Sequence, residues 1–318
     1  MQSKVQRVVV LGTGGTIAGV AATPEDDLDY VAGQVGVGDL VTAARDIADI
    51  AAVVVETEQL AQCDSKDMDF ATWRWLALRI ASHAARPEVA GVVVTHGTDT
   101  LEETAYFLSR VLVVTKPVVL TAAMRPATSA QADGPRNLAD AIAVASRSEI
   151  AGVVVVIAGE VHAARDVRKA HTHRLAAFTS GERGPMARIE GGHATLLRDA
   201  VDVEAQALAI ERLPAEDGAW PWVEIVTSDA GADGRAVEAL RVAGVDGIVV
   251  AATGNGTVHG RLLHALRVAE AHGTAVVRSS RCLDGGIVGG AAAVLASAAD
   301  LTPVKARIEL ILSLLAQR

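Results

Sequence analysis

The sequence predicts an α/β protein with two α/β domains, a larger N-terminal one and a smaller C-terminal one. Short apolar, β-branched runs alternate with amphipathic stretches along most of the chain. The runs are apolar at consecutive positions, which is typical of mostly parallel sheets flanked by helices on both faces. At 318 residues, half of them hydrophobic, the chain exceeds one typical domain.

The N-terminal part of the chain contains the clearest alternation. We expect strands at 8–11, 51–55, 91–95, 118–121 and 153–157. Between them we expect helices at 69–85, 101–111 and 135–147. Asp69 is a suitable N-cap for the first helix, Pro87 ends it, and Pro135 suits a helix start.

From residue 162 the alternation stops and then resumes. Charged residues, histidines and glycines dominate 162–200, which predicts loops and short hairpins. Prolines and glycines punctuate 197–222, which we interpret as a linker between domains 1–196 and 223–318. In the second domain we expect strands at 223–226, 247–251 and 275–277, and helices at 235–243, 260–272 and from Pro303 onward.

Composition excludes several classes of protein. A net charge of −9 argues against nucleic acid as the main partner. Cys63 and Cys282 are the only cysteines, which disfavours a disulfide framework or a cysteine zinc site. No apolar run approaches the ~20 residues of a membrane span, and the first strand begins too early for a signal peptide. We therefore expect a cytoplasmic protein with no membrane partner.

A glycine-rich turn follows the first strand. It presents Thr13 and Thr16 among four glycines, beyond the carboxyl end of the strand, which is where ligands bind in open α/β folds. The turn fits neither the dinucleotide fingerprint, because residue 17 is isoleucine, nor the P-loop, because no lysine follows. The threonines therefore either belong to an active site or only stabilise the turn by local hydrogen bonds.

A second group of polar residues follows the strand at 91–95. The residues His96 to Thr100, HGTDT, precede the helix at 101–111. One interpretation is helix capping, with Thr98 or Asp99 as the N-cap and Glu102 or Glu103 completing a capping box. Capping is compatible with chemistry, because the turn that caps a helix also holds a side chain rigidly.

These two motifs together closely resemble the bacterial L-asparaginases and glutaminase-asparaginases. The likeness rests on TGGTIAG at 13–19 and VVVTHGTDTLEETAYFL at 92–108. Smaller matching segments lie between and beyond them, in the family's order: DYVAGQVG (29–36), DSKDM (64–68), AMRPATSAQADGPRNL (123–138), ARDVRK (164–169), GNGT (254–257) and VVRSSR (276–281). Two long motifs in the right order make a specific signal.

The resemblance implies an amidohydrolase that converts L-asparagine to L-aspartate and ammonia through a threonine acyl-enzyme. It implies that Thr16 is the nucleophile and that Tyr30 lies near it. It also implies a second triad of Thr98, Asp99 and Lys169. No cofactor is expected, and the partner is a small-molecule amide.

The resemblance also implies residues that bind the substrate. Ser65 and Asp67 match positions near the carboxylate and ammonium of the substrate. Asn255 matches a residue that reaches the site from a neighbouring subunit. We therefore expect a homo-oligomer, a dimer or a homotetramer, with sites near subunit interfaces.

The chain departs from the family's pattern at two places. Lys66 stands where many secreted members have glutamine. The segment after VVRSSR is short, and Asp284 is only a weak counterpart of an acidic residue that contacts the substrate ammonium. A cation at position 66 repels an ammonium unless it points away or pairs with Asp67 or Asp99. We predict altered recognition of the substrate α-amino group and a raised KM.

Alternative functions stay open on the sequence alone. Glutamine or another small amide could be the preferred substrate, and the protein could instead be a non-catalytic amino-acid-binding homologue. A subunit of a tRNA-dependent amidotransferase is disfavoured by the acidic net charge. The histidines between 162 and 173 lack metal-ligand spacing, so we expect loop histidines and no metal site: His162, His171 and His173.

Overall fold

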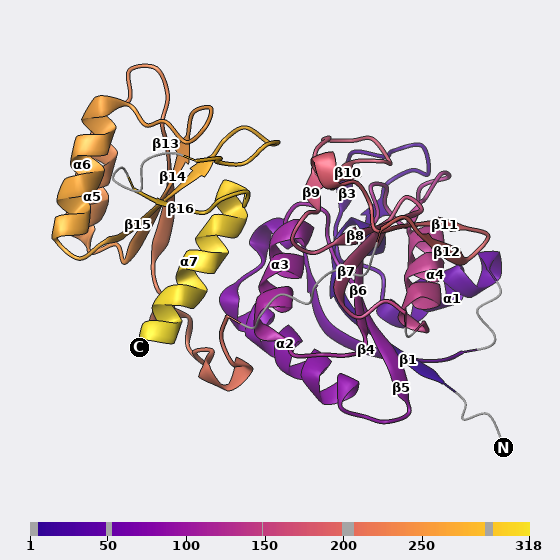
Figure 1. Ribbon diagram of the computed structural model, residues 1–318. Helices are drawn as coiled ribbons and strands as arrows, with labels where there is room; N and C mark the ends of the chain where they lie inside the picture. The colour runs from indigo at the N-terminus through magenta and orange to yellow at the C-terminus, as the bar shows by residue number, and fades with distance from the viewer. Residues whose placement is uncertain (1–5, 49–52, 148, 199–206, 290–294) are drawn as a thin grey trace. The chain divides into compact units, whose positions relative to one another are not determined.

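The computed structural model describes residues 6–48, 53–147, 149–198, 207–289 and 295–318 (Figure 1). The chain divides into two compact units, Met1–Gln206 and Ala207–Arg318. This division falls inside the predicted linker 197–222, and the domain limits 1–196 and 223–318 stay predictions. Each unit is an α/β layer structure, as expected.

An eight-stranded sheet forms the centre of the first unit, in the order β12-β11-β8-β7-β6-β5-β1-β4. The strands are β1 (Arg7–Gly14), β4 (Val54–Cys63), β5 (Val89–Thr95), β6 (Pro117–Thr121), β7 (Gly152–Ile157), β8 (Glu160–Ala163), β11 (Ala187–Glu190) and β12 (His193–Leu196). Strands β4, β1, β5, β6 and β7 are parallel to one another, whereas β8, β11 and β12 are antiparallel to their neighbours. The sheet is therefore mostly parallel.

Helices cover both faces of this sheet (Figure 1). The helices are α1 (Val37–Ile47), α2 (Phe70–Ala84), α3 (Leu101–Val111) and α4 (Gly134–Ala145). Helices α1 and α4 pack together on one face, where their apolar side chains form a buried core with β1 and β7, whereas α2 and α3 lie on the other. The sheet is thus shielded from water, which is why its strands are apolar on both sides.

One crossover connection has the opposite hand to the others. From β5 to β6 and from β6 to β7 the chain moves in the same direction across the sheet. Helix α3 makes the first connection on one face, and α4 makes the second on the other. The β6–α4–β7 connection therefore opposes the hand shared by the α1, α2 and α3 connections, although crossovers are nearly always right-handed.

The strand order reverses between β1 and β5. The chain passes from β1 to its neighbour β4 on one side, and then returns past β1 to β5. In open α/β sheets the crevice at such a reversal is the usual place for a ligand. The two threonine-bearing turns follow these two strands.

The predicted elements of the first unit are largely confirmed. Helices α2 and α3 have the expected limits, and Asp69 caps α2 by accepting a hydrogen bond from the Thr72 amide. The strand expected at 51–55 lies partly outside the described residues, and β4 continues well beyond it. Helix α1 was not predicted from the sequence.

Two short hairpins extend from the carboxyl end of the sheet. The first pairs β2 (Val20–Ala21) with β3 (Tyr30–Val31), and the second pairs β9 (Arg168–Lys169) with β10 (Phe178–Thr179). Three 3₁₀ turns accompany them: η1 (Thr16–Ala18), η2 (Ser65–Asp67) and η3 (Gly181–Arg183). These short elements carry most of the predicted site residues.

The second unit has a four-stranded parallel sheet in the order β13-β14-β15-β16. Its elements are β13 (Val223–Thr227), β14 (Gly247–Ala252), β15 (Ala275–Ser280), β16 (Ala296–Ser297), α5 (Arg235–Ala243), α6 (Gly260–Ala271) and α7 (Pro303–Gln317). Helices α5 and α6 pack together on one face, and α7 covers the other. The predicted helices and strands of this unit are confirmed.

Residues of the predicted linker pack within the second unit. Two 3₁₀ turns, η4 (Ile210–Arg212) and η5 (Asp217–Ala219), interrupt this segment. The Arg212 guanidinium donates to the carbonyls of Leu315 and Ala316, each at 3.2 Å, and so caps the end of α7. The part of the segment from residue 207 onward is therefore tied to unit 2.

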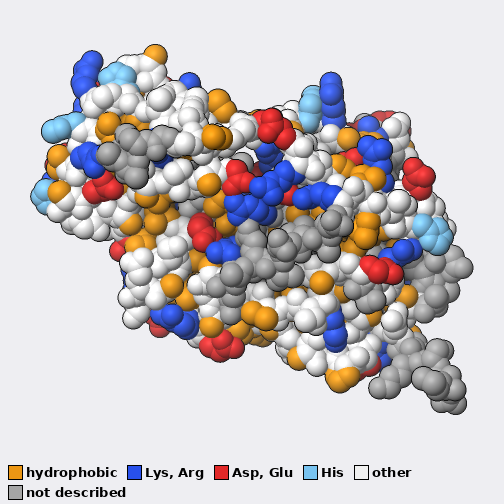
Figure 2. All heavy atoms as spheres, in the orientation of Figure 1, with side chains coloured by type: hydrophobic (Ala, Val, Ile, Leu, Met, Phe, Trp, Pro, Cys, Tyr) orange, Lys and Arg blue, Asp and Glu red, His pale blue; other side chains and the backbone are white. Residues whose placement is uncertain are grey.

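The surface in Figure 2 carries acidic and basic side chains interspersed with apolar and neutral ones. Among the described residues, no helix has the length and apolarity needed to cross a membrane.

Candidate active site

The glycine-rich turn after β1 holds the Thr16 hydroxyl against the phenol of Tyr30. The distance between Thr16 Oγ1 and the Tyr30 hydroxyl is 2.7 Å. Gly14 and Gly15 have φ values of 102° and 81°, which glycine adopts without strain, so the chain reverses directly before Thr16. The Gly15 amide donates to the Cys63 carbonyl at 2.8 Å, which fixes this turn to the end of β4.

The hairpin that carries Tyr30 is held from two sides. Tyr30 pairs with Ala21 between β3 and β2. Asp27, in the connecting loop, accepts a hydrogen bond from Ser129 Oγ at 2.6 Å and forms an ion pair with Arg125 at 3.1 Å. Both partners lie in the segment between β6 and α4, so the connection of unusual hand anchors the Tyr30 loop.

Burial raises the pKa of the Tyr30 phenol above its usual value, and the Thr16 hydrogen bond only partly opposes this effect. Nearby Asp64 and Asp99 raise it further. The phenol is therefore neutral at neutral pH, and its hydroxyl can both donate and accept a proton.

The turn after β5 brings Thr98, Asp99 and Lys169 together. Lys169 Nζ donates to Thr98 Oγ1 at 2.8 Å and to Asp99 Oδ1 at 2.6 Å. Thr98 is buried and Lys169 is half-buried, whereas the Asp99 carboxylate is more exposed. The three side chains thus form a connected polar group, which agrees with the grouping that the resemblance implies.

Lys169 is held in this position by its backbone. It lies in the β9–β10 hairpin, opposite Phe178. The Lys169 amide donates to Glu102 Oε1 on the first turn of α3 at 3.2 Å. The side chain and the backbone of Lys169 therefore both bind the segment 98–102.

The two groups meet at the ends of neighbouring strands. Gly15 precedes Thr16, Gly97 precedes Thr98, and a Cβ atom added to Gly15 would lie 2.3 Å from Gly97 Cα. The Thr13 hydroxyl donates to the Thr95 carbonyl at 2.8 Å and joins the same strand ends. The two turns are therefore in backbone contact at the reversal of strand order.

The residues expected to bind substrate are found in two places. Ser65 is buried, and its hydroxyl accepts a hydrogen bond from the Asp99 amide at 3.1 Å, so it lies beside the second group. Lys66 and Asp67 are exposed and form an ion pair with each other. Lys66 Nζ also lies 3.8 Å from Asp64.

Asn255 belongs to the second unit. Its amide nitrogen donates to the Val288 carbonyl and its amide oxygen accepts from the Val288 amide, each at 2.8 Å. The predicted role of Asn255 in a neighbouring subunit's site stays a prediction.

The capping interpretation of the turn before α3 is wrong. The N-cap is Thr100, and no side chain caps the helix. Thr98 and Asp99 instead bind Lys169, and Glu102 accepts from its backbone. The polar side chains that match a capping box are therefore used to hold a residue from a distant segment.

The structure adds residues that sequence reasoning did not single out as functional. Besides Glu102, these are the buried His96 and the two residues that follow it in a hydrogen-bonded chain, Thr104 and Trp73. The available signal was position: His96 lies between the end of a strand and Thr98, where a buried histidine is unusual.

The histidines considered as metal ligands do not form one cluster: His162 lies in β8, whereas His171 and His173 lie between β9 and β10. His162 is therefore not in a loop as expected, and its Nδ1 is 2.9 Å from Ser180 Oγ. Burial lowers the pKa of His162 to about 4. His171 and His173 pack against each other edge to face. Among the described residues, no three His, Cys, Asp or Glu side chains are grouped as a metal would require.

Both units match known families. Residues 7–202 match the family described as "Asparaginase, N-terminal", and residues 222–318 match the "Glutaminase/Asparaginase C-terminal domain".

Individual relatives cover nearly the whole chain. The chain is 39% identical to L-asparaginase 2 of Escherichia coli (strain K12), over 96% of this chain and 88% of that protein. It is 36% identical to the glutaminase-asparaginase of Pseudomonas fluorescens biotype A, over 90% of this chain and 78% of that protein.

A solved structure is similar throughout. It is the crystal structure of a probable cytoplasmic L-asparaginase from Campylobacter jejuni, with a TM-score of 0.86 and 37% identity, covering 97% of this chain and 95% of that one. The chain therefore belongs to the L-asparaginase and glutaminase-asparaginase family of amidohydrolases.

Proposed function

We propose that the chain hydrolyses the side-chain amide of L-asparagine to L-aspartate and ammonia. The observation that carries this proposal is the pair of hydroxyl groups at adjoining strand ends, each hydrogen-bonded to an ionisable side chain: Thr16 to Tyr30, and Thr98 to Lys169. Membership in the family and the names of the relatives support the choice of substrate.

In the first step, Thr16 Oγ1 attacks the amide carbon. A threonine hydroxyl is a weak nucleophile until its proton is removed. The Tyr30 hydroxyl is in contact with it, and because the phenol is neutral it acts as a relay that accepts this proton while releasing its own. The C–N bond breaks, ammonia leaves with the transferred proton, and an aspartyl ester remains on Thr16.

In the second step, water attacks the ester carbon, aspartate leaves and the Thr16 hydroxyl is regenerated. Lys169 Nζ donates to Thr98 Oγ1, which directs the Thr98 proton away from the lysine and toward substrate or water. Asp99 holds Nζ in this position from the other side. We assign the second group to proton transfer and substrate orientation, with Ser65 and Asp67 near the substrate's charged groups.

The decisive test compares Thr16→Ala with Thr16→Ser in an ammonia-release assay with L-asparagine and L-glutamine. Thr16→Ala is expected to lose on the order of 10³-fold or more in kcat while remaining folded. Thr16→Ser keeps a hydroxyl and is expected to retain measurable turnover and an aspartyl ester at position 16, detected by peptide mass mapping. A wild-type chain that binds asparagine without releasing ammonia would instead be the non-catalytic homologue.

The same assay decides between substrates. Asparagine and glutamine differ by one methylene group, which a pocket discriminates by about 10- to 200-fold. We propose a preference for asparagine. Equal kcat/KM values for asparagine and glutamine would assign the chain to the dual-specificity enzymes.

We further propose a cytoplasmic homo-oligomer, a dimer or tetramer. The similar structure from Campylobacter jejuni is described as cytoplasmic, whereas a 37% identical relative from Haemophilus influenzae is described as periplasmic. Cell fractionation and light scattering measure the two properties directly.

A further inference from the structure

His96 is buried beside the second catalytic group, and the proposed reaction does not use it. It follows β5 directly and precedes Gly97 and Thr98. Its relative exposure is 0%, and its amide donates to the Thr121 carbonyl of β6 at 2.9 Å. The backbone of His96 is thus fixed between two central strands.

The His96 ring belongs to a chain of three hydrogen bonds. Trp73 Nε1 lies 2.9 Å from Thr104 Oγ1, which lies 3.0 Å from His96 Nε2. On the other side of the ring, Nδ1 lies 2.7 Å from the Gly97 carbonyl oxygen. These hydrogen bonds therefore link helices α2 and α3 to the turn that presents Thr98.

Donor and acceptor chemistry gives every bond in this chain one direction. The Trp73 N–H can only donate, so Thr104 Oγ1 accepts from it. Thr104 donates its own proton to His96 Nε2, because in the neutral ring with Nδ1 protonated this nitrogen carries no proton. The Gly97 carbonyl can only accept, so Nδ1 carries the ring proton. Burial lowers the pKa of His96 to about 4, which keeps this neutral tautomer at neutral pH.

The Gly97 carbonyl belongs to the peptide that joins Gly97 to Thr98. This peptide lies where the backbones of the two turns meet, and a Cβ atom added to Gly97 would lie 2.5 Å from Ser65 Oγ. A rotation of the peptide would change the direction of Thr98 and move its hydroxyl relative to Lys169 Nζ, which now lies 2.8 Å away.

We propose that His96, oriented by Thr104 and Trp73, is a positioning residue that fixes the Gly97–Thr98 peptide and thereby holds the Thr98 hydroxyl against Lys169. This inference rests on the proposed function, because it assigns His96 to the same amide hydrolysis. It predicts that the Nδ1 donor is the part of the ring that matters for turnover.

Two substitutions test the roles of the two ring nitrogen atoms separately. In His96→Asn the amide nitrogen occupies roughly the position of Nδ1, so the bond to the Gly97 carbonyl is kept and the bond to Thr104 is lost. In His96→Gln the amide reaches the position of Nε2, so the contact with Thr104 is kept and the bond to Gly97 is lost.

The experiment measures kcat and KM for L-asparagine, together with thermal unfolding, for both variants. His96→Gln is expected to lower kcat about 10- to 100-fold with little change in KM, because a misplaced catalytic group slows the chemistry. His96→Asn is expected to recover most of the wild-type kcat. Leu76→Ala, which removes a fully buried side chain from α2, serves as the control for lost stability. Its kcat, measured at a temperature at which the variant stays folded, is expected to equal that of the wild type.

Equal kcat values for the two variants, or a lower value for His96→Asn, would overturn the proposal and leave His96 a core residue. If the wild-type chain releases no ammonia from asparagine or glutamine, the proposed function fails instead. Crystal structures of the two variants then test the positioning role of His96 without an activity assay. A Thr98–Lys169 distance that is unchanged in His96→Gln contradicts this role.

Discussion

Lys66 and Asp67 form an ion pair where the family resemblance places the substrate ammonium. The hydrogen bond that Lys66 donates to Asp67 raises the pKa of Lys66, so the lysine is charged at every pH at which the enzyme would be assayed. The pair gives Lys66 one of the two acidic partners considered for it. In the substrate-binding role proposed for Asp67, its carboxylate is therefore already partly neutralised by Lys66 when the substrate ammonium approaches.

We predict that Lys66→Gln lowers KM for L-asparagine about two- to fivefold, the size expected for releasing one exposed ion pair. Because Lys66 is not part of either catalytic group, kcat is expected to stay the same. Steady-state kinetics with succinamate, which is asparagine without its α-amino group, provides the matched control, and its KM is expected not to change. A Lys66→Gln enzyme with an unaltered KM for asparagine would show that Lys66 does not affect ammonium binding.

The contact between Lys169 and Thr98 shows how far residue-level prediction could go. The two residues are 71 positions apart, and no local pattern joins them. The family resemblance supplied the grouping, whereas the local motif was also compatible with a capping box, which the structure does not contain. A polar side chain near a helix start satisfies both patterns, and only the fold decides which partner it takes.

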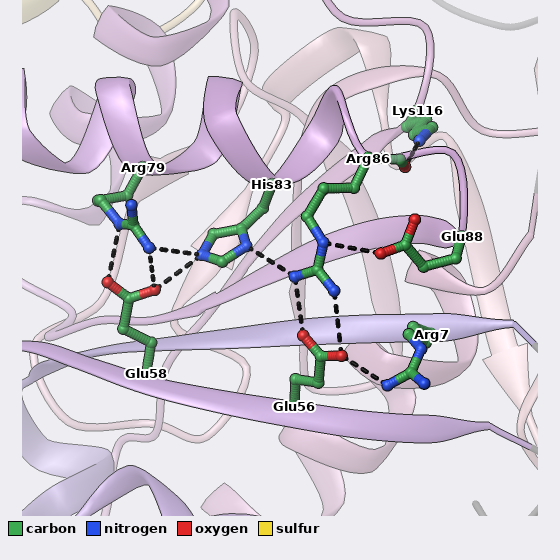
Figure 3. Close-up of polar contacts among 8 residues, drawn as sticks. All are labelled: Arg7, Glu56, Glu58, Arg79, His83, Arg86, Glu88 and Lys116. Carbon is green, nitrogen blue, oxygen red and sulfur yellow. Dashed lines mark hydrogen bonds and ion pairs between the residues drawn. The ribbon is translucent and has the colours of Figure 1, made fainter.

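The edge of the large sheet is held to helix α2 by a network of charged side chains (Figure 3). Strand β4 is the last strand of the described sheet on this side. Its Glu56 accepts hydrogen bonds from Arg86 and Arg7, and Glu58 binds Arg79 and His83. Charged side chains on an edge strand also disfavour pairing with another chain.

Glu56 is expected to make stability depend on acidic pH. Hydrogen bonds from Arg86, and to a lesser degree Arg7, lower the pKa of Glu56 to about 2. A carboxylate whose pKa is lower in the folded state stabilises fully above its unfolded pKa of ~4.5, and loses this contribution as the pH falls toward 2. We predict that Glu56→Gln costs roughly 1 kcal/mol at pH 7, since the group is partly solvated.

Urea unfolding of wild type and Glu56→Gln at several pH values between 7 and 3 measures this contribution. The difference in unfolding free energy is expected to shrink below about pH 4.5. Glu88→Gln is the matched control, because Glu88 also binds Arg86 but is more exposed, and a smaller cost is expected. A difference that stays constant down to pH 3 would contradict the assignment.

Helix α1 shows why some elements could not be predicted. It begins after Gly36 with no side-chain cap of its own, and Gly38 occupies its first turn. Its first amide, that of Val37, donates instead to Gln59 Oε1 on β4 at 2.8 Å. The start of α1 is therefore set by a residue 22 positions away, whereas α2 has its own cap in Asp69.

The arrangement of the first unit explains why the site forms where it does. The reversal of strand order places the ends of β1 and β5 side by side. The connection of opposite hand carries the segment with Arg125 and Ser129 to the loop that bears Tyr30. Sequence predicted the parallel sheet and its helices, but neither strand order nor crossover hand has a local signal.

The expected role of Asn255 concerns the whole assembly. Its amide is bound on both sides by the Val288 backbone, so Asn255→Ala could lower activity simply by disturbing this turn. Complementation separates that effect from a contribution to a neighbouring subunit's site. In a symmetric dimer of Thr16→Ala and Asn255→Ala chains, one site combines both intact residues if they come from different subunits.

We predict that co-expression of Thr16→Ala and Asn255→Ala chains restores activity, because random pairing leaves about a quarter of the sites intact. The measurement is ammonia release by the purified mixture, compared with the sum of its two parents. Thr16→Ala paired with Thr98→Ala is the control, and it is expected to stay inactive because both residues belong to one unit of one chain. A Thr16→Ala and Asn255→Ala mixture no more active than its parents would confine the role of Asn255 to its own turn.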